Sequence, residues 1–149
     1  LMLRHPESPD HKADWELTQA ALNWLTSHHF DFAFIYLGNT DVVGHDQGWM
    51  SQPYLEAIQE ADRCIAEMLE SLPGESVTIV MADHGGHERL HGTDLEVDMR
   101  IPILARGPGI KAGHMLADGA SILDVSPSIL HLLGVPAPRE WTGAPLWEQ

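Results

Sequence analysis

Val77-Thr78-Ile79-Val80-Met81-Ala82 runs directly into Asp83-His84-Gly85-Gly86-His87, and this stretch decides how the rest of the chain is interpreted. A short apolar run bounded by polar and glycine-containing segments is typical of a buried β-strand. The two residues that close it, Asp83 and His84, carry side chains that bind metal ions in proteins. The stretch therefore predicts a strand with metal-type ligands at its carboxyl end.

The same arrangement occurs earlier in the chain. The apolar run 32–37 predicts a second buried strand, and the polar, glycine-containing segment 39–48 that follows it predicts a loop. Asp41 and His45 lie four residues apart in this loop. Because ligands in open α/β sheets bind beyond the carboxyl ends of strands, the side chains that follow the two strands are expected to form one site.

Two more histidines, His87 and His91, follow the Asp83-His84 pair. Carboxylate oxygens combined with imidazole nitrogens suit zinc or manganese better than calcium. The acidic and histidine side chains after the two strands are numerous enough for two metal ions. Two metals about 4 Å apart hold both the attacking and the leaving oxygen of a phosphoryl displacement.

Apolar periodicity and breaker residues predict the remaining elements. They are a helix from Trp15 to about His28 capped by Asp14, a helix from Pro53 to about Leu72, a strand 101–105, and a helix 127–133 capped by Asp124 or Ser126. Residues 1–13 and the tail from Arg139 are expected to be irregular. This order of elements predicts an α/β fold, and residues 1–149 are expected to form a single domain.

Composition excludes several classes of protein. Eight basic against 22 acidic residues give a formal charge of −14, which argues against a nucleic-acid scaffold as partner. With 44% apolar and 20% charged residues, the composition is typical of a soluble globular protein. The sequence contains no apolar run long enough to span a membrane. The single cysteine, Cys64, is expected to be a small core residue, and the cellular compartment is left unassigned.

The order of these motifs resembles the alkaline phosphatase superfamily, and most of all its type I phosphodiesterases and nucleotide pyrophosphatases. The likeness covers about residue 30 to the end of the chain. It rests on three segments similar to metal-ligand motifs and on two that resemble a strand and a helix near the family's C-terminus: 41–48, 82–86, 91–93, 101–110 and 122–136.

The resemblance implies an alkaline-phosphatase-like sheet with flanking helices, of which this chain carries the C-terminal part only. It implies two divalent metal ions, with Zn²⁺ favoured and Mn²⁺ as the alternative. The implied ligands are Asp41, His45 and His91 at one metal, and Asp83 and His84 at the other. The His-Gly step at residue 91 matches the family, so His87 is left as an alternative ligand or as a residue that contacts a ligand.

The function implied is a two-metal hydrolase of small phosphate diesters or pyrophosphates. The family's Thr or Ser nucleophile comes from an N-terminal half with no counterpart here, so no catalytic nucleophile is assigned. The chain begins at Leu1, which suggests a fragment or a processed product, and the resemblance implies that it is the C-terminal portion of a larger hydrolase. Two alternatives stay open: a non-catalytic metal-binding or assembly module from a truncated gene, and a phosphomutase or sulfatase-like relative. The full ligand set favours the two-metal phosphate branch over the single-metal sulfatases.

A lone half of such a sheet exposes a strand edge with unpaired backbone groups. We therefore expect either a homo-oligomer formed through that edge or a covering segment from residues 1–30.

Overall fold

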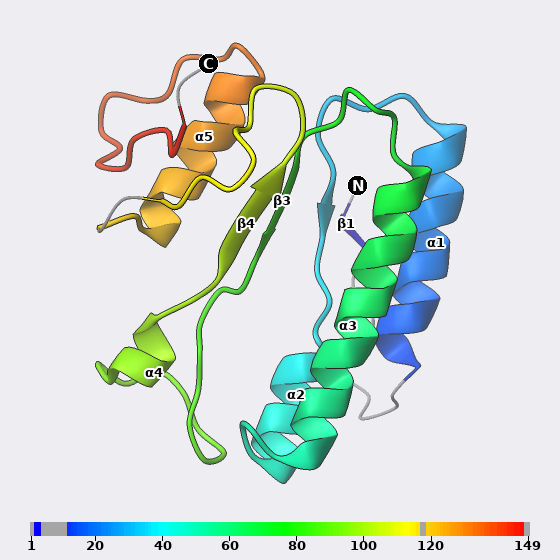
Figure 1. Cartoon of the computed structure of the whole chain (residues 1–149), viewed down its shortest axis with the longest axis vertical. Coiled ribbons are helices and arrows are strands. Elements are labelled where there is room, and N and C mark those ends of the chain that lie inside the picture. Colours follow the sequence, from blue (N-terminus) through cyan, green and yellow to red (C-terminus); the bar gives the residue numbers. More distant parts are fainter. Residues whose placement is uncertain (1, 4–11, 117–118, 148–149) are drawn as a thin grey trace. The chain divides into compact units, whose positions relative to one another are not determined.

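The computed structural model of the chain describes residues 2–3, 12–116 and 119–147, and the chain divides into two compact units. The first unit comprises residues 1–74 and 84–102, and the second comprises residues 75–83 and 103–149. Both contain helices and short strands, so the predicted mixed α/β fold with flanking helices is confirmed (Figure 1). The assignment of the whole chain to a single domain stays a prediction.

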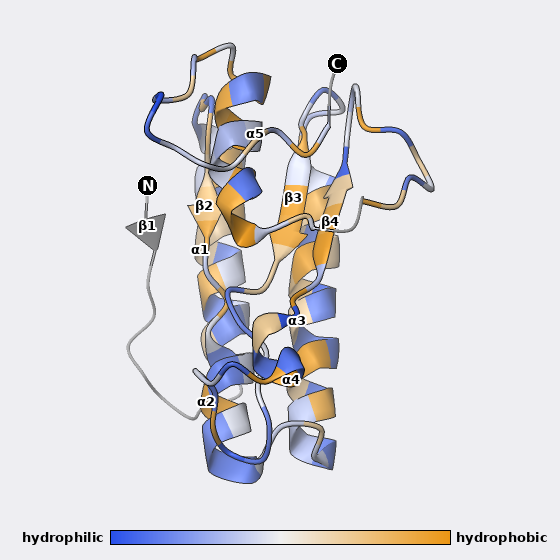
Figure 2. Ribbon diagram, turned by 90° about the vertical axis from the view of Figure 1, so that its left-hand side faces the viewer, coloured by the Kyte–Doolittle hydropathy of each residue, from blue (hydrophilic) through white to orange (hydrophobic). Residues whose placement is uncertain are grey.

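Two long helices form the core of the first unit. Helix α1 (Ala13–Ser27) lies along helix α3 (Gln52–Ser71), as Figure 1 shows, and both predicted helices are confirmed. Apolar stripes run along both helices (Figure 2), and Leu17 and Ala21 of α1 are buried, as are Ala57 and Cys64 of α3. Cys64 is completely buried, as predicted, and this burial raises the pKa of its thiol.

The segment predicted as a loop after residue 38 is a helix, α2 (Asn39–Gln47). Its N-terminus is stabilised by Asp14, whose Oδ1 accepts hydrogen bonds from the backbone N–H groups of Gly38 at 3.0 Å and Asn39 at 3.3 Å. A carboxylate at this position satisfies free N–H groups and complements the helix dipole. Because Asp14 comes from α1, the local sequence of the segment contains no sign of this cap.

The predicted role of Asp14 is correspondingly wrong. Lys12 occupies the N-cap position of α1 without a side-chain cap, and Asp14 is buried in the first turn of the helix. Its carboxylate caps α2 instead of α1.

Replacing Asp14 with Ala is expected to destabilise the first unit by about 1–3 kcal/mol, because two backbone N–H groups lose their acceptor. Urea unfolding followed by circular dichroism measures the effect. Asp31→Ala, at an exposed position, is the control. Equal stability of the two variants would contradict the capping role.

The predicted strand 32–37 is much shorter than expected. Strand β2 contains only Phe34–Ile35 and pairs in parallel with strand β1 (Met2–Leu3). Residues 2–3 are therefore not irregular, and the same expectation for residues 4–11 lies outside the described residues. A segment from within residues 1–30 does lie along one edge of β2. Phe34 is 53% exposed, so β2 is not the fully buried strand that was predicted. Oligomerisation through a sheet edge stays a prediction, which sedimentation velocity would check.

The second unit is built on an antiparallel pair of strands, β3 (Thr78–Met81) and β4 (Ile103–Arg106), in a register that places Met81 opposite Ile103. A 3₁₀ turn, η1 (Ile122–Asp124), leads into helix α5 (Val125–Leu132). The strands and the helix confirm the predicted elements. Asp124 occupies the N-cap position of α5, as predicted, but its side chain makes no cap bond to α5 and instead forms a capping box with Ser121 on η1.

The C-terminal tail has no regular structure up to residue 147, as predicted, but hydrogen bonds hold it in place. Asp124 Oδ1 accepts a hydrogen bond from the Ala144 N–H at 2.8 Å. The Oγ of the fully buried Ser128 accepts one from the Leu146 N–H, also at 2.8 Å. The tail is therefore anchored to the start of α5.

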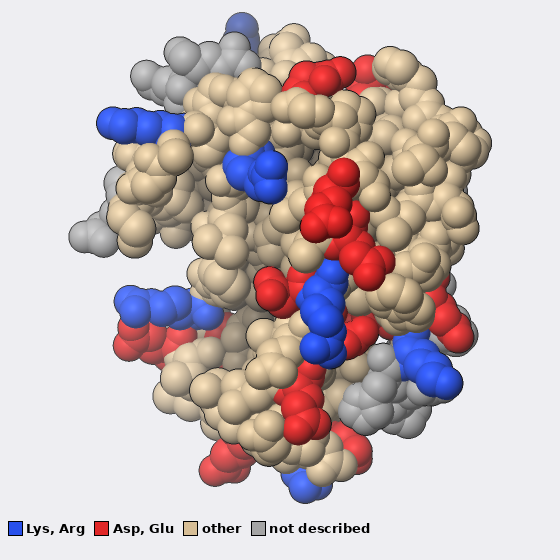
Figure 3. Space-filling model, turned by 45° about the vertical axis from the view of Figure 1, so that its right-hand side comes forward, with Lys and Arg blue, Asp and Glu red and all other residues tan. Residues whose placement is uncertain are grey.

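Acidic and basic side chains lie interspersed among uncharged ones on the face shown in Figure 3. No extended basic patch covers this face, in keeping with the formal charge of −14. In the part of the chain that the structure describes, none of the helices combines the length and the apolar character needed to cross a membrane.

Candidate metal centre

Helix α2 places two of the predicted ligands side by side. Asp41 and His45 are separated by four residues, and side chains with this spacing lie on the same face of an α-helix. The Nε2 atom of His45 lies 3.5 Å from Oδ1 of Asp41. The helical conformation therefore creates a carboxylate–imidazole pair that the predicted loop would not have fixed.

The segment that enters the first unit at residue 84 brings two further imidazoles to the same carboxylate. The Nε2 atoms of His84 and His91 lie 3.8 Å and 3.7 Å from Asp41 Oδ1. Their rings stack on each other, with centroids 3.8 Å apart and an angle of 17° between the ring planes. Three imidazole nitrogens thus surround a single carboxylate oxygen.

The oxygen at the centre of this cluster fits a metal ligand better than an ordinary hydrogen-bond acceptor. Asp41 Oδ1 is buried and has no hydrogen-bond partner among the described residues, and 3.5–3.8 Å is too long for a hydrogen bond. Two atoms that each lie about 2.1 Å from one tetrahedral ion are about 3.4 Å apart. The ligand atoms of Asp41, His45 and His91 all lie within 4.8 Å of one another, which suits one divalent cation.

Backbone carbonyls set the tautomers of two of the histidines. His45 Nδ1 lies 2.9 Å from the carbonyl oxygen of Arg89, and His84 Nδ1 lies 2.8 Å from that of Gly85. A carbonyl oxygen only accepts, so each neutral ring carries its proton on Nδ1 and has a lone pair on Nε2. Hydrogen bonds of this kind orient metal-binding imidazoles, and both Nε2 atoms face Asp41.

Trp49 packs against the cluster, although the sequence analysis assigned it no role. Its ring centroid lies 5.1 Å from that of His45 and 5.9 Å from that of His91, both in edge-on geometry. A Cβ atom at Gly44 or Gly86 would come within 2.8 Å or 2.3 Å of the indole. Gly44 and Gly86, which lie next to predicted ligands, were therefore the features of the sequence that could have indicated a bulky side chain packed against this site.

A cavity of about 640 Å³, open to solvent, adjoins this side of the cluster. Trp49 and Arg89, which both contact His45, belong to its lining. Met50 and Glu88, also in the lining, have positive φ angles of 64° and 48°, a conformation that costs energy in residues other than glycine and is enriched at functional sites. The cavity is the candidate place for a small ligand beside the metal centre.

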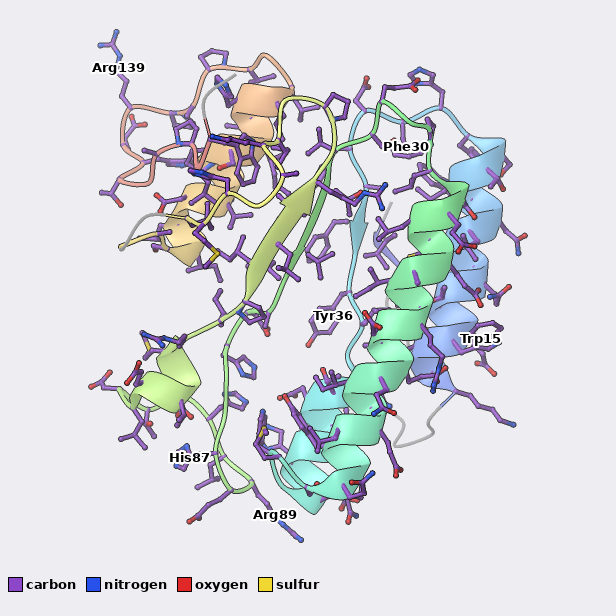
Figure 4. The ribbon with its side chains drawn as sticks, in the orientation of Figure 1. Trp15, Phe30, Tyr36, His87, Arg89 and Arg139 are labelled. Carbon is purple, nitrogen blue, oxygen red and sulfur yellow. The ribbon has the colours of Figure 1, made fainter. Side chains whose placement is uncertain are left out.

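His87, the alternative ligand, points its Nδ1 at a different carboxylate. This atom lies 2.8 Å from Oδ1 of Asp98 in the short helix α4 (Glu96–Met99), which the sequence did not predict. Oδ2 of Asp98 accepts hydrogen bonds from the Thr93 N–H at 2.9 Å and from the Thr93 hydroxyl at 2.7 Å. Figure 4 shows His87 and Arg89 on the same loop before α4. His87 does not belong to the ligand group around Asp41.

Asp98 is another site residue that the sequence analysis missed, because nothing in the local pattern distinguishes it from the exposed Asp94. Its side chain is only 1% exposed. The hydrogen bond from His87, together with those from Thr93, lowers the pKa of the Asp98 carboxyl from 3.8 to about 2.

The lowered pKa of Asp98 predicts an acid-sensitive contribution to stability. The ionised form is favoured in the folded protein, so its contribution is fully present above the unfolded-state pKa of 3.8 and is lost as the pH falls towards about 2. Urea unfolding of the metal-free chain between pH 5 and pH 2 measures the effect. As the pH falls, the free energy of unfolding should decrease less for Asp98→Asn than for wild type. Parallel pH profiles would contradict this.

Of the predicted site residues, the structure brings together Asp41, His45, His84 and His91. His84 was assigned to the second metal, and it lies against the same Asp41 oxygen as the other two histidines. Asp83 belongs to the second unit, so its role as a ligand of the second metal stays a prediction.

An α/β fold that gathers one buried carboxylate oxygen and three imidazole nitrogens is the arrangement expected of a metal-binding protein. Residues 7–137 match the Metalloenzyme superfamily. The chain belongs to this superfamily, in agreement with the predicted alkaline-phosphatase-like fold.

Individual relatives of this chain are 2,3-bisphosphoglycerate-independent phosphoglycerate mutases. The chain is 25% identical to that of Rhodopirellula baltica over 151 residues, which cover 97% of this chain and 27% of the relative. It is 30% identical to that of Prochlorococcus marinus subsp. pastoris over 152 residues (93% and 27%), and 27% identical to that of a Synechococcus species over 158 residues (98% and 29%). The chain thus spans less than a third of the length of these relatives. Because they are mutases, the closer likeness to nucleotide pyrophosphatases stays a prediction.

Proposed function

We propose that this chain is the metal-binding part of an enzyme that transfers or hydrolyses the phosphate group of a small phosphate ester with the help of two divalent cations. The observation that carries the proposal is the buried Oδ1 atom of Asp41, which has no hydrogen bond from the described residues and has three imidazole Nε2 atoms within 3.8 Å. Membership of the Metalloenzyme superfamily supports it.

In this proposal Asp41, His45 and His91 hold one cation, and Asp83 and His84 hold the other, with Zn²⁺ favoured and Mn²⁺ as the alternative. A divalent cation supplies a Lewis acid, which lowers the pKa of a hydroxyl nucleophile or stabilises a leaving oxygen. Other residues of this chain orient the ligand side chains and cover the site. The Arg89 and Gly85 carbonyls keep the imidazole lone pairs directed at the site, and the indole of Trp49 covers one side of it.

A phosphate ester is an unexpected ligand for a chain with a net charge of −14. Bound divalent cations invert the local field, so the charge at the site differs in sign from that of the whole protein. It follows that the chain should bind inorganic phosphate only after it has taken up metal.

Two subtypes of reaction remain candidates. The motif segments in the sequence favour hydrolysis of phosphate diesters or pyrophosphates. The names of the relatives favour a phosphomutase, which moves a phosphate group between positions of a small phosphorylated acid. We assign no nucleophile within this chain in either case, so the non-catalytic metal-binding module remains the alternative for the chain by itself.

The test has two measurements on the purified 149-residue chain. Zinc or manganese at 100 times its dissociation constant should stabilise the fold by about 2.7 kcal/mol, seen as a rise in the unfolding temperature. Hydrolysis of bis(p-nitrophenyl) phosphate and isomerisation of 3-phosphoglycerate are then assayed with the bound metal, next to Asp41→Ala.

A chain that binds neither metal at neutral pH would refute the proposed function. Bound metal without turnover is the expected result. Turnover that Asp41→Ala abolishes would instead show that a nucleophile, either a side chain of this chain or an activated water, is present after all. The substrate that is converted would then decide between the two subtypes.

A further inference from the structure

One buried carboxylate outside the ligand group holds the segment that carries His91. We propose that Asp98 is a positioning residue for the metal centre, because its carboxylate binds His87 and Thr93, one on each side of His91, and so fixes the loop between them. The proposal rests on the proposed function, since it concerns the same metal site. It goes further in assigning to Asp98 the task of ordering the loop that carries His91.

The two carboxylate oxygens of Asp98 bind opposite ends of the loop. Oδ1 takes the hydrogen bond from His87 at the start of the loop, and Oδ2 takes two hydrogen bonds from Thr93 at its end. Few other groups could do this, because a carboxylate accepts at both oxygens and has no hydrogens of its own. The 1% exposure of the side chain keeps water from competing for these bonds.

The loop between these two anchor points has a backbone that needs such restraint. His87 and Leu90 exchange two backbone hydrogen bonds, of 3.0 Å and 2.9 Å, which close a tight turn. Glu88 within this turn has a φ of 48°, and Gly92 has a φ of 89°. Left-handed conformations in residues other than glycine persist only where the surroundings hold them.

The clamped loop acts on two of the three residues in the ligand group. His91 lies on the loop and contributes its imidazole directly. Arg89, also on the loop, contributes the carbonyl oxygen that accepts from His45 Nδ1. A displacement of the loop would therefore move one ligand and release the orientation of another.

The main chain of Asp98 is connected to the third imidazole, that of His84, through Gly85. Its carbonyl oxygen accepts a hydrogen bond of 2.7 Å from the N–H of Gly85, the residue after His84. The Gly85 carbonyl in turn orients His84. Side chain and main chain of this one residue are thus connected to all three histidines around Asp41.

The experiment compares Asp98→Asn with Asp94→Asn, the same chemical change at an exposed position of the same segment. Zinc affinity is measured by competition with a chelator. Cobalt(II) replaces zinc in a second measurement, because its visible absorption reports the number and geometry of the ligands. Loss of contacts behind metal ligands costs about 10–100-fold in metal affinity. We expect a loss in this range and an altered cobalt spectrum for Asp98→Asn, and neither for Asp94→Asn.

A milder pair of variants tests the same contact without removing the carboxylate. Thr93→Val removes the hydroxyl donor and keeps the N–H, whereas Thr93→Ser keeps both. We expect Thr93→Val to weaken zinc binding several-fold and Thr93→Ser to restore wild-type affinity and the wild-type cobalt spectrum. This pair keeps the proposal testable if Asp98→Asn does not fold.

The outcomes separate this inference from the proposed function. A wild-type chain that binds no zinc refutes the proposed function and this inference with it. A wild-type chain that binds zinc, next to an Asp98→Asn variant with unchanged affinity and cobalt spectrum, overturns only the positioning role. A lower unfolding temperature of Asp98→Asn with unchanged zinc binding would show a merely structural residue and would also overturn it.

Discussion

Asp41→Asn should lower the zinc affinity of the chain at least a hundred-fold while leaving its fold intact. The substitution keeps the shape of the side chain but replaces a charged carboxylate oxygen by a neutral amide. Three imidazoles converge on that oxygen, and it is the only negative group of the ligand cluster Asp41, His45 and His91. A hundred-fold loss corresponds to about 2.7 kcal/mol of binding free energy.

The behaviour of the metal-free protein separates this effect from misfolding. Oδ1 of Asp41 has no hydrogen bond to lose among the described residues, so the metal-free variant should unfold at the wild-type temperature or slightly above it. Asp46→Asn, on the same helix and exposed, is the matched control for both measurements. Zinc affinity by isothermal titration within threefold of wild type in Asp41→Asn would remove Asp41 from the ligand set.

Gly85→Ala is expected to have the largest effect on stability, a loss of about 3 kcal/mol. A Cβ atom at Gly85 would lie 2.0 Å from the carbonyl oxygen of Val97 and 3.3 Å from that of Arg100. Both neighbours are backbone, so no side chain can move aside to make room. The displaced backbone would also lose the hydrogen bond from the Gly85 N–H to Asp98.

Thermal unfolding measures this prediction well. For a chain of this size, 3 kcal/mol corresponds to a fall of roughly 6–12 °C in the unfolding temperature. Gly74→Ala provides the control, because a Cβ atom there meets nothing within 4 Å. The zinc affinity of Gly85→Ala should fall as well, since the carbonyl of Gly85 orients His84. An unfolding temperature equal to that of Gly74→Ala would mean that the segment accommodates a side chain at residue 85.

The sequence predicted the helices and strands that depend on local pattern. The prediction failed where contacts with residues distant in the sequence determine the local structure. Helices α1, α3 and α5 follow from apolar periodicity and breaker residues, and the structure confirms them. Helix α2 is different, because its sequence contains glycine and adjacent valines and reads as a loop. The hydrogen bonds from its N-terminus to Asp14 compensate for the weak helix propensity.

The candidate site shows the same division. Asp41 and His45 stood out by residue type and spacing, and the family resemblance favoured His91 over His87 as the third ligand. The structure places the ligand atoms of these three residues together. Asp98 and Trp49 act on the cluster through contacts that no spacing in the sequence reveals. The burial of a carboxylate and the packing of an indole between glycines are properties of the folded chain.

The use of backbone carbonyls to orient His45 and His84 determines which changes evolution can make around this centre. Every amino acid has a carbonyl, so position 89 is free to change without affecting the tautomer of His45. Position 85 has no such freedom, because Val97 blocks any residue larger than glycine. Homologues that share the centre can therefore differ at residue 89, and a search for them should require glycine at 85 and leave 89 open.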